Sequence, residues 1–444
     1  SMFNPPKFAG MLNSIMKEKS GKSEDEKLAR ELMEDDAQPK VNKKFTTFRE
    51  HPLYQKISTM RTLASTFHIE DPFFREHERV NGTVTRINGK DYVNYSSYNY
   101  LGFNGSAELN EAVINAVKVH GTSVGASRLV AGERPFQRSL ERKLADVYDA
   151  DDAIVFVSGH ATNVSVISTL FGAGDLIIND SLVHNSIIEG IKLSGATHFP
   201  YVHNDMDSLE NLLKKNRRNH ERVLIVTEGL FSMDGDIPDL PKLIELKKRF
   251  GCFLMIDEAH SLGVLGKTGK GVYEHFDVDP HDVDLWMGTL SKTLSGCGGY
   301  IAATQDIVDI LKYNAPGFVF SVGISAPMAV AAETALDMLK KDPSRVKRLQ
   351  ENGKLFLETA KSLNLNTGKS LGYSVVPIIT GSSRKAVWLS AALFKEGINV
   401  QPIIHPAVEE RQARLRFFIT SEHTAEQITK TCEILSSLCK NEGI

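Results

Sequence analysis

The run at residues 252–260 reads CFLMIDEAH, an apolar stretch that ends in two carboxylates and a histidine. A continuous apolar run of this length is typical of a strand covered on both faces of a parallel sheet. Helical patterns separate most of the similar runs, so the sequence predicts an α/β fold with a mostly parallel sheet. The similar runs are DAIVFVSG (152–159), DLIIND (175–180), RVLIVTEG (222–229), LWMGTLSK (285–292) and GGYIAA (298–303).

The chain divides by pattern into four segments. A charged arm at 1–50 includes residues 17–44, which are dense in Lys, Glu and Asp, and the segment 51–106 contains alternating runs around Asn88-Gly89, a hairpin signal. The large α/β domain is predicted at 107–326. From 327 to 444, helical patterns alternate with the runs SVVPIIT, INVQPII and RLRFFIT, which predicts a smaller α+β domain.

Composition excludes several classes of protein. The 444 residues carry 52 basic and 55 acidic side chains, a formal net charge of −3, which gives no bulk attraction to nucleic acid. The four cysteines form no CxxC pair and no zinc-ligand spacing, so we expect no metal. No apolar run reaches the roughly 18 residues of a membrane span, and no signal peptide is evident. We expect a cytoplasmic protein without transmembrane segments, for which peripheral membrane contact stays open.

The string DEAH at 257–260 also occurs in helicases, where it acts together with a phosphate-binding loop of the GxxxxGK[ST] type. The nearest candidate is Gly266-Lys267-Thr268, in which Ser261 stands where the first glycine of that loop belongs. It also follows the acidic box instead of preceding it. We therefore reject a nucleotide-hydrolysing function.

Polar residues follow the predicted strands, at the edge where parallel sheets bind ligands. Three of them match the needs of pyridoxal phosphate (PLP), which are a lysine, an acid for the pyridine nitrogen and donors for the phosphate. Lys292 lies in the small-residue segment GTLSKTLSGCGG, Asp257 ends an apolar strand, and residues 158–160 open a helix whose N–H groups face an anion. The full set of candidates is Ser158, Gly159, His160, His184, Ser232, Asp257, His260, Thr289 and Lys292.

At these residues the chain resembles the α-oxoamine synthases, which are PLP enzymes of fold type I with an aspartate aminotransferase-like architecture. The family includes serine palmitoyltransferase, 8-amino-7-oxononanoate synthase, 5-aminolevulinate synthase and glycine C-acetyltransferase. The resemblance extends from about Tyr92 to Thr420 and does not cover the arm. It rests on the segments GTSVGASRLVAGERPFQRSLE (121–141), SGHATN (158–163), DSLVHNSIIEG (180–190), TEGLFSMDGDIPDL (227–240), IDEAHSLGVLG (256–266), GTLSKTLSGCGG (288–299) and ARLRF (413–417).

The resemblance implies a role for each candidate. Lys292 would bind PLP covalently, Asp257 would pair with its pyridine nitrogen, and His184 would stack on its ring. His260 and Ser232 would approach the ring oxygen. Residues 158–160 and Thr289 would bind the phosphate, with Ser321 of the partner subunit. Arg416 would hold the carboxylate of the substrate, and Asn99 in SYNYLG would also contact substrate.

The implied reaction is a decarboxylating condensation of a small amino acid with an acyl thioester, carried by coenzyme A or an acyl carrier protein. The segments SYNYLG and SGHATN favour serine, and with it serine palmitoyltransferase chemistry in sphingolipid biosynthesis. Glycine or alanine remains an alternative, as do a transaminase or lyase on the same fold and a silent scaffold subunit. The resemblance also implies a homodimer with shared sites. Gln137 departs from the family, which usually has histidine there, and the charged arm is a candidate docking element for a carrier or a membrane surface.

Overall fold

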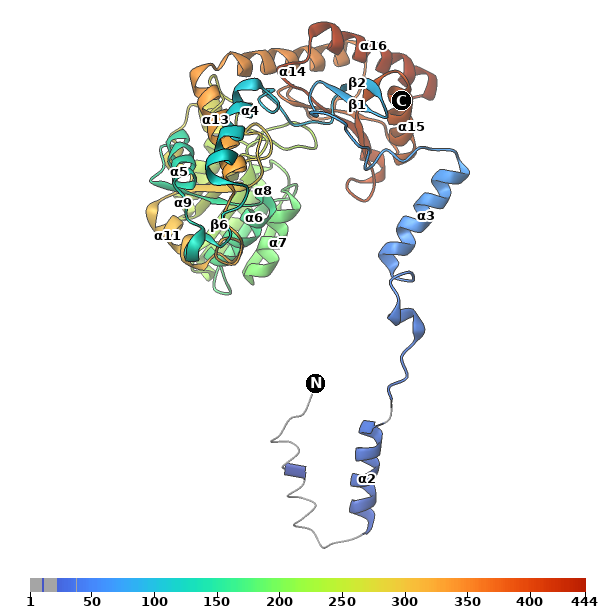
Figure 1. Cartoon of the computed structure of the whole chain (residues 1–444), viewed down its shortest axis with the longest axis vertical. Helices are drawn as coiled ribbons and strands as arrows, with labels where there is room; N and C mark the ends of the chain where they lie inside the picture. Colours follow the sequence, from blue (N-terminus) through green and yellow to red (C-terminus); the bar gives the residue numbers. More distant parts are fainter. Residues whose placement is uncertain (1–9, 12–21, 37) are drawn as a thin grey trace. The chain divides into compact units, whose positions relative to one another are not determined.

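The computed structural model describes residues 10–11, 22–36 and 38–444 (Figure 1). Part of the predicted charged arm, residues 1–9, 12–21 and 37, therefore lies outside the described residues. The chain forms two compact units, residues 1–70 and 71–444. The predicted boundaries at 50, 106 and 326 stay a prediction.

A seven-stranded sheet forms the centre of the larger unit, and it confirms the predicted mostly parallel α/β fold. Each apolar run quoted for the large domain lies in it, and most of its strand residues are buried. Within this sheet, β9 runs antiparallel to both of its neighbours, β3 and β8. The order is β3 (Asp152–Phe156), β9 (Gly299–Ala303), β8 (Leu285–Thr289), β7 (Phe253–Asp257), β6 (Val223–Glu228), β4 (Leu176–Asp180) and β5 (Thr197–Tyr201).

Helices pack against this sheet and bury two apolar clusters with the strands. Ile154, Ile177 and Met255 belong to one cluster, while Val155, Ile178 and Leu254 belong to the other, as the alternation of side chains along a strand requires. The helices of this region are α4 (Ala107–His120), α5 (Pro135–Val147), α6 (Gly159–Leu170), α7 (Asn185–Ser194), α8 (Met206–Asn216), α9 (Leu240–Phe250), α10 (Val272–Phe276), α11 (Gln305–Asn314), α12 (Pro316–Val319) and α13 (Ala326–Lys341).

Two small sheets complete the larger unit. Strands β10 (Val375–Ile379), β13 (Arg414–Phe418) and β12 (Gln401–Ile403) pair antiparallel in that order. The predicted hairpin, β1 (Val84–Ile87) and β2 (Lys90–Asn94), turns at Asn88 and Gly89, which both have positive φ. Strand β2 then pairs in parallel with β11 (Ile398–Asn399), so the hairpin joins the C-terminal part of the chain (Figure 1). Helices α14 (Ser344–Ser362), α15 (Ser383–Lys395) and α16 (Ala425–Glu442) belong to this part.

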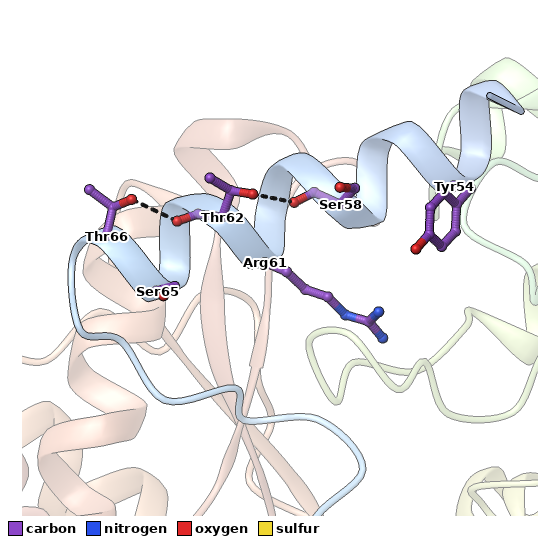
Figure 2. A pocket seen from close by; sticks show the side chains of 6 residues that line it. All are labelled: Tyr54, Ser58, Arg61, Thr62, Ser65 and Thr66. Carbon is purple, nitrogen blue, oxygen red and sulfur yellow. Dashed lines mark hydrogen bonds between the residues drawn. The ribbon is translucent and has the colours of Figure 1, made fainter. Parts of the chain in front are cut away.

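The smaller unit contains α2 (Lys22–Asp36) and α3 (Pro52–Thr66). A hollow of about 340 Å³ lies along α3, and Figure 2 shows the side chains that line it. Its lining residues all belong to this helix, and the hydroxyls of Thr62 and Thr66 donate to the carbonyls of Ser58 and Thr62. These two hydroxyls are already used within the helix. None of the described helices is long and apolar enough to cross a membrane.

Candidate active site

The predicted site residues gather at one edge of the large sheet. Strands β4, β6, β7 and β8 are parallel, so their carboxyl ends share that edge. Asp257 is the last residue of β7, Thr289 ends β8 three residues before Lys292, and Ser158 follows β3. The loop after β4 leads to His184 at the start of α7. The topology therefore places most of the candidates around one space.

Asp257 is buried, with 3% of its surface exposed, and its two carboxylate oxygens have separate donors. The backbone N–H of Ala259 donates to Oδ1 at 2.9 Å, and the amide of Asn163 donates to Oδ2 at 3.2 Å. Asn163 also donates to the hydroxyl of Ser186 at 2.9 Å. This network fixes the orientation of a carboxylate that has little access to water.

Lys292 is half-buried, and its ammonium lies 4.9 Å from the centre of the Tyr98 ring. Burial lowers the pKa of Lys292, and the neighbouring Arg416 lowers it further, while Asp257 and Glu228 oppose the shift. A lowered pKa increases the fraction of neutral amine, the form that attacks a carbonyl carbon. The surroundings of Lys292 thus suit a nucleophilic lysine.

His184 is held by its own helix and by a buried acid. Its Nδ1 accepts the backbone N–H of Ser186 at 3.1 Å, which places the proton of the neutral ring on Nε2. Its backbone N–H donates to Glu228 at 2.9 Å. Desolvation lowers the pKa of His184, against the influence of Asp257. The ring is therefore a neutral group, as a stacking role requires.

Glu228 ends β6 opposite Asp257 in the parallel register. Burial raises the pKa of Glu228 well above its usual range, and Asp257 raises it further. Both effects disfavour the charged form of the Glu228 carboxyl, because burial removes water and the neighbouring carboxyl adds like charge.

His260 and Arg416 lie on the same side of the site. The imidazole Nδ1 of His260 hydrogen-bonds the hydroxyl of Tyr100 at 2.8 Å, and burial lowers the pKa of His260 well below 6.5. The ring of Phe418 stacks on His260, with ring centres 6.1 Å apart, and the Arg416 guanidinium lies 4.8 Å from the same ring. Arg416 also donates to the hydroxyl of Ser232 at 3.5 Å. The guanidinium keeps donors free for a carboxylate.

The start of α6 supplies an anion-binding edge. The first N–H groups of a helix have no partner within it, and here they belong to Gly159 and His160. A Cβ on Gly159 would lie 3.3 Å from the Thr289 hydroxyl, a tight contact, so the start of α6 packs closely beside β8. These N–H groups, the Lys292 amine and the buried Asp257 carboxylate lie at the same edge of the sheet, and together they fit the phosphate, the aldehyde and the pyridine nitrogen of PLP.

Three residues singled out in the sequence have surroundings that do not include the residues described above. Asn99 exchanges hydrogen bonds between its amide and the backbone of Asn104, at 3.3 Å each, so its side chain is occupied by its own loop. Ser321 lines a hollow of about 740 Å³ with its neighbours Val319, Phe320 and Val322 and with Ser123, Gly125, Ala126, Ser127, Leu129 and Val130. The proposed contacts of both with substrate or cofactor stay predictions. Gln137 is fully buried and bonds the backbone of Gly132, Arg134 and Ile324, which gives it a structural role.

The model of the family "Aminotransferase class I and II" matches residues 90–435. The chain belongs to this family. Among curated proteins, this aminotransferase-family chain is 38% identical to the 8-amino-7-oxononanoate synthase of Symbiobacterium thermophilum, over 81% of this chain and 91% of that protein. It is 39% identical to the enzyme of the same name from Treponema denticola, over 81% and 90%.

Solved structures agree with this assignment. Serine palmitoyltransferase of Sphingomonas wittichii has a TM-score of 0.84 and 27% identity, and covers 88% of this chain and 97% of its own. The 8-amino-7-oxononanoate synthase of Francisella tularensis has a TM-score of 0.69 and 29% identity, over 80% and 99%. Another solved serine palmitoyltransferase contains PLP. The chain is thus an enzyme of the α-oxoamine synthase group within the aminotransferase family, and its cofactor is PLP.

Three residues of the site were not predicted from the sequence. Glu228 ends the run VLIVTE in the same way as Asp257 ends FLMID, so the rule of strand-end polar residues could have found it. Asn163 and Tyr100 lie within the motifs SGHATN and SYNYLG, but no local pattern indicates their partners Asp257 and His260. In this family member, each of the three forms a hydrogen bond with a predicted residue: Glu228 with His184, Asn163 with Asp257 and Tyr100 with His260.

Proposed function

We propose that this α-oxoamine synthase condenses a small α-amino acid, alanine first, with an acyl thioester and releases carbon dioxide and a free thiol. The observation that carries the proposal is the grouping of Lys292 and Asp257 at one sheet edge, in a chain 36–39% identical to curated 8-amino-7-oxononanoate synthases. The comparisons with curated proteins favour this alternative over serine and sphingolipid biosynthesis.

The name of the relatives' product supports alanine. Oxononanoate with an amine at position 8 and a ketone at position 7 has one carbon beyond the amine, which corresponds to the methyl group of alanine. The opposite end of that product is a carboxylate, so a dicarboxylic acyl chain fits as the second substrate. Serine with a long acyl chain is the second candidate, favoured by the TM-score of 0.84 with serine palmitoyltransferase.

We assign the chemistry to this chain's own residues as follows. When bound, PLP withdraws electrons from the amino acid attached to it, which makes the bonds of the α-carbon labile. Lys292 holds the cofactor and then accepts the α-proton on its Nζ, and Asp257 keeps the pyridine nitrogen protonated. Arg416 binds the amino-acid carboxylate, and His184 packs on the cofactor ring. His260 and Ser232 hold the ring oxygen in place.

The choice of amino acid gives a direct prediction. With a dicarboxylic acyl-CoA as donor, we expect kcat/KM for alanine to exceed that for serine by about 10-fold or more, because the hydroxyl of serine gives up its bonds to water and a site built for alanine does not replace them. Release of thiol, measured with alanine, glycine and serine in turn, checks this. Faster release with serine and palmitoyl-CoA would favour the second candidate.

Arg416 gives a second prediction. We expect Arg416→Lys to raise KM for the amino acid by about 10- to 100-fold, since lysine cannot form the bidentate pair with a carboxylate. KM for the acyl thioester should change far less. The exposed Arg411 provides a matched control, and Arg411→Lys should leave both constants unchanged. Equal increases in both constants would contradict the assignment of Arg416 to the amino acid.

We further propose that the N-terminal arm helps to receive the acyl donor from an acyl carrier protein. Acidic residues dominate α2, whereas Lys40, Lys43 and Lys44 follow it, and this short basic stretch after α2 is the surface that we propose for an acidic carrier. Deleting residues 1–44 should raise KM for a carrier-bound acyl group several-fold and leave KM for acyl-CoA unchanged. An unchanged KM for both donors would refute this role.

A further inference from the structure

A buried histidine bridges two aspartates beside the site. His203 follows β5, and its Nδ1 and Nε2 lie 2.8 Å from Asp180 and 2.6 Å from Asp236. A carboxylate only accepts hydrogen bonds, so both ring nitrogens carry protons and the ring is an imidazolium. The His203 side chain is 8% exposed, and the Phe231 ring packs against it nearly at right angles, with ring centres 4.5 Å apart.

The first carboxylate leads to His184. Asp180 is the last residue of β4 and is fully buried. Its Oδ1 accepts the backbone N–H of Leu182 at 2.9 Å, and its Oδ2 accepts that of Asn204 at 3.0 Å. The turn that begins at Asp180 continues directly to His184. The orientation of Asp180 therefore sets the start of this turn.

The second carboxylate leads to Ser232. The carbonyl of Asp236 accepts the N–H of Phe231 at 2.9 Å, and Gly235 donates back to the carbonyl of Phe231 at 2.8 Å. These bonds close the turn that contains Ser232. Gly235 has φ +78°, and a Cβ there would lie 2.2 Å from the carbonyl oxygen of Val375, so the turn requires glycine at this position.

We propose that His203 is a positioning residue of the cofactor site, which joins the turn before His184 to the turn that carries Ser232. The inference rests on the roles proposed for His184 and Ser232. A buried charge network adds little net stability, because desolvation offsets its attraction, whereas it does restrict geometry. Here one imidazolium holds two turns that approach the same cofactor ring from different strands.

The test compares His203→Asn with the double variant His203→Asn/Asp236→Asn in protein saturated with PLP. Asparagine is too short to reach both carboxylates. The single variant leaves buried carboxylates without a cation, so we expect a clear loss of melting temperature. The double variant removes one of those charges and should recover part of that loss. The circular dichroism of bound PLP should stay altered in both, and kcat should stay about 10- to 100-fold lower.

Hydrogen exchange in unreacted protein gives an independent readout. We expect faster exchange in residues 181–186 and 230–237 of both variants. The matched control is His281, an exposed histidine that also bridges two aspartates, Asp279 and Asp149. His281→Asn should change neither the cofactor signal nor exchange in these segments.

A merely structural His203 would give a different result. In that case the double variant would recover melting temperature, cofactor dichroism and kcat together, and this outcome would overturn the proposal. The cofactor and exchange signals need no second substrate. They therefore test His203 even if the chain releases no thiol, a result that would refute the proposed function alone.

The pH dependence supplies a further check. The groups that face His203 are Asp180 from β4, Asp236 from the 231–236 turn and, beside Asp180, Tyr201 at the end of β5. Despite burial, the two aspartates raise the pKa of His203 to about 9. Because the pKa of His203 is higher in the folded chain than in the unfolded chain, its protonation stabilises the fold. This stabilisation is complete below about pH 6.5 and is lost as the pH rises through 9. The difference in melting temperature between the natural chain and His203→Asn should shrink over that range, and a constant difference would contradict the bridge.

Discussion

Lys292→Ala is expected to abolish the visible absorbance of lysine-bound PLP and to lower kcat by about 1000-fold or more, because the chain loses both the covalent link and the proposed proton acceptor. Lys292 lies half-buried beside Tyr98 and just after the end of β8, where burial rather than an ion pair dominates the surroundings of its amine. The substitution should therefore leave the melting temperature of the apoprotein within a few degrees. Absorbance spectra and thiol release on the same preparation measure both effects.

The exposed Lys267 provides a matched control on a neighbouring loop. Lys267→Ala should keep both the absorbance and the activity. If Lys292→Ala retained the absorbance of lysine-bound PLP, another lysine would hold the cofactor and the assignment of the site would be wrong. Retention of thiol release would equally exclude Lys292 as the proton acceptor.

Asp257→Asn is expected to give the second large effect, a fall in kcat of about 100- to 10,000-fold. The neutral amide cannot hold a proton on the pyridine nitrogen, and its NH₂ group would face one of the two donors that now bond the carboxylate, the amide of Asn163 or the N–H of Ala259. We also expect weaker PLP binding. Single-turnover kinetics with alanine and equilibrium binding of PLP measure the two losses separately.

Asp284 provides the control for simple damage to the sheet. It lies just before β8, and its carboxylate accepts the N–H of Leu254 on β7 at 2.8 Å and pairs with Lys247. Asp284→Asn keeps an acceptor for Leu254 and should cost stability without loss of PLP binding. Equal activity losses in the two variants would show that Asp257 acts only through the fold.

Much of the fold is predictable from the sequence because the central strands are short apolar runs without polar interruption. The antiparallel direction of β9 could also have been predicted. Only residues 290–298 connect β8 to β9, which is fewer than a parallel crossover needs. The pairing of β2 with β11 could not have been predicted in this way. About 300 residues separate partners such as Val93 and Ile398, and no local pattern encodes that contact.

The position of a site residue was predictable where that residue follows a strand. Contacts between residues far apart in the sequence were not. Asp257 and Lys292 each follow an apolar run, so their place at the sheet edge follows from the topology. The contact between Tyr100 and His260 joins residues that are 160 positions apart. Asn99 differs again, since its own loop occupies its amide, a local bond that the motif SYNYLG did not indicate.

The most direct test of the proposed condensation is a simultaneous measurement of thiol and carbon dioxide from purified protein, PLP, alanine and a dicarboxylic acyl-CoA. We expect equal amounts of both products, formed only when both substrates are present and absent in Lys292→Ala. Transfer of the amino group from alanine, with pyruvate formed and no thiol released, would contradict the proposed condensation and identify the chain as a transaminase.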